Sequence, residues 1–149
     1  MSGISSAKIV ATVTAVAAVC MIGPGIAQAD AASVPLRMRA IQVAEHQKGD
    51  WYAWGAAGPS RFDCSGLVYY SYKKAGKTLP RTAQAQYNKV KHISAKNARV
   101  GDLIFFGSKG SIYHVGFYSS RSHVLHAPHT GAKVRAEKLW TKQIHYGRL

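Results

Sequence analysis

The stretch Arg61-Phe62-Asp63-Cys64-Ser65-Gly66-Leu67 marks the start of a helix and holds the one cysteine that lies beyond the first 20 residues of the chain. After Cys64, apolar or small residues recur with the period of a helix, which predicts a helix to Ala75 with Gly76 as its stop. Asp63 is suited to cap this helix, since a side-chain oxygen there can accept from backbone N–H groups of the first turn. Cys64 therefore lies at the first turn of a helix, directly after a loop.

Two interpretations of Cys64 are open: an idle buried residue, or a reactive nucleophile. The unpaired N–H groups and the positive end of the helix dipole face the first turn, and we expect them to lower the pKa of the thiol. Ser65 and Gly66 leave little bulk near the sulfur, so a substrate backbone could approach it. The position at a helix start favours the reactive thiol.

Residues 1–29 have the pattern of a signal peptide. One basic residue, Lys8, precedes an apolar run over 9–22, which is shorter than the about 20 residues that a membrane-spanning helix needs. The run is followed by helix breakers and then by Ala27-Gln28-Ala29, with small residues at the positions that a signal peptidase reads. We expect cleavage after Ala29, loss of Cys20 with the leader, and a secreted or cell-wall-associated chain without a stable membrane anchor. A retained anchor is the alternative.

The remaining residues predict one α+β domain. We expect a short N-terminal segment over 30–35 and a catalytic domain over 36–149, because about 120 residues suffice for one core and not for two. The expected elements are helices over 36–48, 64–75 and 82–90, and strands over 102–106, 114–118, 123–127 and 133–137. The N-terminal helices would then pack on a central antiparallel sheet.

The chain is strongly basic, with 20 Lys and Arg residues against 6 Asp and Glu residues. On a secreted domain this charge indicates an anionic environment, such as nucleic acid, an acidic membrane surface, or a cell wall rich in phosphate and carboxylate. The basic residues are scattered, and no nucleic-acid-binding motif frames them. We therefore expect no specific nucleic-acid partner, and a generally solvated basic surface explains the charge equally well.

A thiol nucleophile needs a base, and the base needs a group that orients it. His114 and His126 stand out among the seven histidines, because a predicted turn lies midway between them. In a hairpin they would lie opposite each other within about one position, so that one imidazole could orient the other. The pattern favours a Cys64–His114–His126 triad. Histidines with only a structural role are one alternative. A zinc site built from the same three residues is another, although no second cysteine or acidic ligand at a short spacing supports it.

The chain also resembles the NlpC/P60 family of cell-wall cysteine peptidases, over about residues 36–140. The motifs that carry the resemblance are Phe62–Val68, Arg99–Phe106, His114–Tyr118 and His126–Gly131, with further likeness in Trp51–Gly55 and Leu79–Thr82. The resemblance implies a papain-like fold, with helices that carry the cysteine packed on a sheet that carries the histidines. It also implies that Cys64 is the nucleophile, His114 the general base and His126 the orienting residue.

By the same resemblance, Tyr52, Asp63 and Ser65 occupy positions that hold the peptide of the substrate near the nucleophile. Asp63 could pair with a substrate amine, cap its helix, or do both. We expect a monomer without metal or cofactor that hydrolyses peptidoglycan stem peptides, at the bond from D-glutamate to the diamino acid. Its charge would hold it to anionic cell-wall polymers. The alternatives are a wall amidase or acyltransferase on the same triad, and a non-catalytic cationic wall-binding protein.

Overall fold

The computed structural model describes residues 34–149. The leader expected over residues 1–29, with cleavage after Ala29, lies outside the described residues and stays a prediction. Among the residues that are described, no helix is long and apolar enough to cross a membrane.

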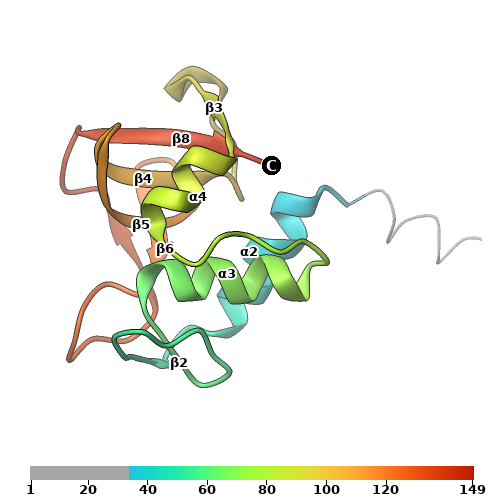
Figure 1. Cartoon of the computed structure of the whole chain (residues 1–149), viewed down its shortest axis with the longest axis vertical. Helices are drawn as coiled ribbons and strands as arrows, with labels where there is room; N and C mark the ends of the chain where they lie inside the picture. Colours follow the sequence, from blue (N-terminus) through green and yellow to red (C-terminus); the bar gives the residue numbers. More distant parts are fainter. Residues whose placement is uncertain (1–33) are drawn as a thin grey trace, which may run out of the picture. The chain divides into compact units, whose positions relative to one another are not determined.

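Helices come first along the chain and most strands follow (Figure 1), so the predicted α+β class is confirmed. The helices are α2 (Leu36–His46), α3 (Cys64–Lys74) and α4 (Ala83–Lys89), with a short 3-10 turn, η1 (Ala95–Asn97). The strands are β1 (Trp51–Tyr52), β2 (Arg61–Phe62), β3 (Lys91–Ile93), β4 (Leu103–Ser108), β5 (Ser111–Ser120), β6 (His123–His126), β7 (Arg135–Lys138) and β8 (Ile144–Arg148).

Six of these strands form one antiparallel sheet in the order β3-β8-β4-β5-β6-β7. The sequence predicted β4 to β7 but neither β3 nor β8, and β8 inserts between β3 and β4 (Figure 1). A buried carboxylate fixes this last strand. Each carboxylate oxygen of Asp102 accepts a 2.7 Å hydrogen bond from the guanidinium of Arg148. The backbone N–H of Arg99 donates a further hydrogen bond of 2.7 Å to this carboxylate.

The helix that carries Cys64 is fixed at its first turn and along its apolar face. The Asp63 side chain accepts from the backbone N–H of Gly66 at 2.7 Å, which confirms the predicted cap. Further along α3, the ring of Tyr72 stacks on Phe117 of β5, with 5.9 Å between ring centroids. The main core lies between the helices and the sheet and includes Leu67, Val68, Tyr72, Phe105, Val115 and Phe117, all of them fully buried. The cap and this core together determine where Cys64 lies relative to β5.

The β5–β6 hairpin differs from the expected register. Phe117 pairs with Leu125, so the ladder places His126 across from Gly116 and not across from His114. The prediction that the two histidines lie opposite within one position was therefore wrong, because the turn lies at residues 121–122 and not at the expected midpoint, residue 120. Residues two apart on a strand share a face, so the histidines still meet diagonally, over a glycine that has no side chain.

We expect Gly116→Ala to lower the free energy of unfolding by about 1–3 kcal/mol, through overpacking. A Cβ at this position would lie 2.4 Å from Val124 Cγ2 and 2.9 Å from both His126 Cβ and Leu125 O, so β6 would have to move. Gly110→Ala is the matched control, since nothing lies within 4 Å of a Cβ there. Urea unfolding of both variants tests the close approach, and equal midpoints would contradict it.

Candidate active site

Cys64 is a half-buried free thiol at the first residue of α3. Burial and the neighbouring Asp63 carboxylate raise the pKa of the thiol, whereas the backbone N–H groups of Val115, Ser65 and Cys64 itself hydrogen-bond to the sulfur and oppose the shift. The expectation that the helix start lowers this pKa was therefore wrong for the free protein, because lost solvation outweighs the N–H groups. Cys64 is a neutral thiol at neutral pH.

His114 and His126 contact each other through their rings. His114 Nε2 lies 2.7 Å from His126 Nδ1, and both residues are buried. Burial, helped by the neighbouring His126, lowers the pKa of His114 to about 3. Burial also lowers the pKa of His126, although a hydrogen bond with Glu137 opposes the shift. Both imidazoles are therefore neutral at neutral pH, the form that can accept a proton.

Glu137 and Trp140 complete the surroundings of the histidines, and sequence reasoning assigned neither to the site. Glu137 Oε2 lies 2.8 Å from His126 Nε2. The Trp140 ring stacks on Phe106, with 4.4 Å between centroids, and its centroid lies 5.4 Å from that of His126. Glu137 is one of only 6 acidic residues in the chain. It ends the predicted strand 133–137, which directly follows the predicted strand that holds His126. These two facts together could have identified it from the sequence. Trp140 lies outside every predicted element, so no such signal existed.

Two adjacent pockets meet at Cys64. One, of about 360 Å³, is lined by Cys64 together with His114 and His126. The other, of about 470 Å³, includes Asp63 and Ser65 beside Cys64. Tyr52 and Trp54 line both pockets. All six predicted site residues therefore lie around one groove. Within residues 34–149, no three His, Cys, Asp or Glu side chains are grouped in a way that could hold a metal ion.

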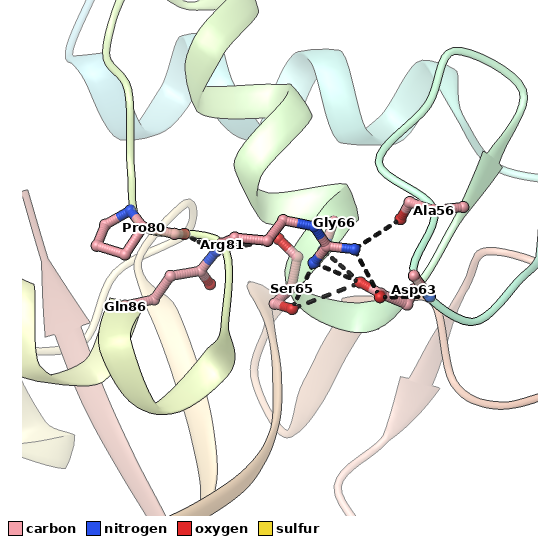
Figure 2. A network of polar contacts seen from close by, with 8 residues as sticks. Ala56, Asp63, Ser65, Gly66, Pro80, Arg81 and Gln86 are labelled. Carbon is pink, nitrogen blue, oxygen red and sulfur yellow. Dashed lines mark hydrogen bonds and ion pairs between the residues drawn. The ribbon is translucent and has the colours of Figure 1, made fainter.

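The Asp63 carboxylate is already fully engaged (Figure 2). Arg81 donates to Oδ1 at 2.9 Å and to Oδ2 at 2.6 Å, and the backbone N–H of Gly55 donates to Oδ2 at 3.0 Å. Arg81 also donates to Ser65 Oγ at 2.9 Å, and so connects the start of α3 to the segment before α4. Arg81 lies in the segment Leu79–Thr82, which carries part of the family resemblance, but no role was predicted for this side chain. Asp63 is an isolated acidic residue next to the predicted nucleophile in a basic chain, and this was a signal that a basic side chain would pair with the Asp63 carboxylate.

The buried side chain of Gln86 also connects α4 to the first turn of α3. Gln86 of α4 donates to the carbonyl of Ser65 at 3.0 Å and to that of Pro80 at 2.9 Å, as Figure 2 shows. The first turn of α3 is thus held from one side by Arg81 and from another by Gln86. The position of Cys64 follows from these contacts, since it lies in the same turn.

The model that describes the NlpC/P60 family matches residues 49–147. A bifunctional muramidase/DL-endopeptidase of Bacillus subtilis, CwlT, is 48% identical over 88 residues, which cover 56% of this chain and 27% of that protein. The chain spans about a fifth of the length of the first curated relatives that it matches.

Solved structures show the same fold. The peptidoglycan hydrolase RipB of Mycobacterium tuberculosis has a TM-score of 0.69 and 30% sequence identity, over 83% of this chain and 68% of that one. RipD of the same organism, described as a non-catalytic domain protein adapted to peptidoglycan binding, has a TM-score of 0.67 and 26% identity, over 78% of this chain and 98% of that one. The likeness therefore includes one hydrolase and one protein that only binds.

The neutral, buried His114 predicts that acid destabilises the protein. Its pKa is about 3 in the folded chain against 6.5 for an exposed histidine, so its contribution to stability is present above pH 6.5 and is lost as the pH falls. Between pH 7 and pH 5 the loss should be about 2 kcal/mol. Over the same pH interval, the free energy of unfolding of His114→Gln should fall by about 2 kcal/mol less than that of the wild type. His46→Gln, at an exposed position of α2, should follow the wild type. Urea unfolding at both pH values measures this, and parallel losses in all three proteins would count against it.

Proposed function

Because this chain belongs to the NlpC/P60 family, we propose that it is a peptidoglycan endopeptidase with Cys64 as nucleophile, His114 as general base and His126 as orienting residue. One observation carries the proposal. The 2.7 Å contact between His114 Nε2 and His126 Nδ1 lies in the wall of a pocket that Cys64 shares. A thiol, a base and a group that orients the base are the three parts that thiol catalysis needs.

The proposed reaction starts from a neutral thiol and a neutral imidazole. As the sulfur attacks the carbonyl carbon of a stem peptide, the thiol proton passes to His114 Nδ1. The resulting C–S bond replaces the C–N bond when His114 returns this proton to the leaving amine. His114 then takes a proton from water as the water oxygen attacks the acyl carbon, and it returns this proton to the sulfur when the C–S bond breaks and the acid product leaves. The proton transfer accompanies attack because burial disfavours the separated charges in the free enzyme.

The oxyanion of the intermediate would be met by the Cys64 backbone N–H and by the Tyr52 hydroxyl. Tyr52 lines both pockets beside Cys64. Burial, with the nearby Cys64 and Asp63, raises the pKa of Tyr52, so its hydroxyl keeps the proton that it would donate. Donors aimed at the developing negative charge are the main source of such stabilisation.

We propose that Tyr52, Asp63 and Ser65 bind the stem peptide, and that the bond cleaved joins D-glutamate to the diamino acid. The DL-endopeptidase activity in the name of the Bacillus relative supports this bond. Since Arg81 balances the charge of Asp63, a substrate amine would meet a neutral pair and not a free carboxylate. Asp63 would then act through the neighbours that it holds in place, Ser65 and Arg81.

Export from the cell is part of the same proposal. The signal-peptide pattern of residues 1–29 supports cleavage after Ala29 and action outside the membrane. The full chain has a net charge of +14 at pH 7, of which only Lys8 would be lost with the leader, and such a charge suits a wall rich in anionic polymers.

A non-catalytic peptidoglycan-binding protein is the second candidate function, and the likeness to RipD favours it. Binding alone does not require two hydrogen-bonded neutral histidines in the same pocket as a thiol. This arrangement therefore favours the endopeptidase over the binding protein. An amidase or acyltransferase with the same triad would break or form a different bond, so the products distinguish it.

Cys64→Ala should abolish turnover and leave the fold intact, because only the sulfur is removed. Mass spectrometry of muropeptides after digestion of purified peptidoglycan identifies the bond. The wild type should release fragments that begin with the diamino acid, and Cys64→Ala should release none. If the wild type leaves the muropeptides unchanged but still sediments with the wall, the result would support a non-catalytic peptidoglycan-binding protein. Activity that persists in the Ala variant would refute Cys64 as nucleophile.

A further inference from the structure

Glu137 extends the line of the two histidines beyond His126. Its Oε2 lies 2.8 Å from His126 Nε2, and Arg135 donates to its other oxygen, Oε1. In the β6–β7 ladder His126 pairs with Arg135, and Val124 pairs with Glu137. Residues two apart on a strand share a face, so these side chains meet as a consequence of the register. The side chains of His114, His126 and Glu137 thus form a line of two successive hydrogen bonds.

The carboxylate fixes the direction of every hydrogen bond along this line. An ionised carboxylate only accepts, so His126 Nε2 must carry a proton. A neutral imidazole has one N–H, so His126 Nδ1 is bare and His114 Nε2 must donate to it. His114 Nδ1 is then the bare nitrogen, the one that can take a proton.

The neighbouring groups keep Glu137 ionised and the histidines neutral. Burial opposes ionisation of Glu137, but hydrogen bonds from Arg135 and His126 outweigh it and lower the pKa of the carboxyl group. Burial lowers the pKa of both histidines. The remaining titratable neighbour of His126 is His129, whose charge would lower the pKa of His126 further.

We propose that Glu137 is a positioning residue that selects the tautomer in which His114 Nδ1 can accept the proton of Cys64. The inference rests on the proposed function for the role of His114 as base, while the direction of the hydrogen bonds rests on the contacts among the three side chains and on their charge states. During attack the thiol proton moves to His114 Nδ1, and no proton moves to Glu137. The carboxylate stabilises the imidazolium through His126, as the third member of a triad does.

Glu137→Gln tests this selection because it keeps the shape of the side chain and replaces one acceptor oxygen by a donor. Arg135 would hold the amide oxygen, so the NH₂ group would face His126 Nε2 and both histidines would change tautomer. We expect kcat on muropeptides to fall roughly 100-fold with KM within about twofold. Glu137→Ala imposes no donor and should keep more activity than the Gln variant. Glu45→Gln, the same change in a partly exposed carboxylate that pairs with Lys48 on α2, should match the wild type.

The tautomers are read directly from ¹⁵N NMR spectra of labelled histidine side chains in the full chain, without substrate. The wild type should carry its protons on Nε2 of both His114 and His126, and Glu137→Gln should carry them on Nδ1. A Gln variant that keeps the wild-type tautomers, or that is more active than the Ala variant, would overturn the inference. If the wild type does not cleave peptidoglycan, the proposed function fails, and the NMR comparison still decides the role of Glu137.

Discussion

The site depends on one close approach, that of β6 to the backbone of β5 at Gly116. A side chain at this position would collide with Val124 and His126. Because there is none, His126 crosses the space above Gly116 and reaches His114, two residues away along β5. The resulting ring-to-ring contact is buried, so it removes both imidazoles from water and holds them neutral. The chemistry proposed for the site follows from that neutrality.

The thiol is positioned by a separate set of contacts, which meet at Asp63. This carboxylate caps α3 and holds Arg81, and Arg81 reaches Ser65 in the same turn. Cys64 is thus fixed by polar contacts among the helices, and the histidines by the register of the sheet. Core residues such as Tyr72 and Phe117 bring the two halves together. A rigid support of this kind is what the proposed nucleophile and base require for a productive geometry.

Local signals in the sequence predicted much of this arrangement. The periodicity after Cys64 located α3, Asp63 was identified as its cap, and strand-like runs between Gly- and Ser-rich turns indicated β4 to β7. Non-local features escaped prediction. Strand β8 pairs with β3 and β4, which precede it by more than 30 residues, and its anchor is the contact between Arg148 and Asp102. No local pattern reports such a pairing.

The errors in the predicted site have the same origin. The register of His126 depends on which residues form the turn, and the pKa of Cys64 depends on burial by neighbours that are distant in sequence. The roles of Arg81 and Glu137 depend on which partner each charged group finds in the fold. The residue types required for the chemistry were visible in the sequence, whereas the hydrogen bonds that orient them were visible only in the structure.

The proposed chemistry requires that the free protein hold Cys64 as a neutral thiol and His114 as a neutral imidazole in one pocket. The rate at which iodoacetamide alkylates Cys64 as a function of pH tests it most directly, since only the thiolate reacts. Mass spectrometry of the peptide that contains Cys64 separates this site from Cys20. For a neutral thiol, we expect the rate to rise about tenfold per pH unit and to continue rising above pH 8. A rate that is already constant between about pH 5 and pH 7 would show a preformed thiolate and contradict the claim.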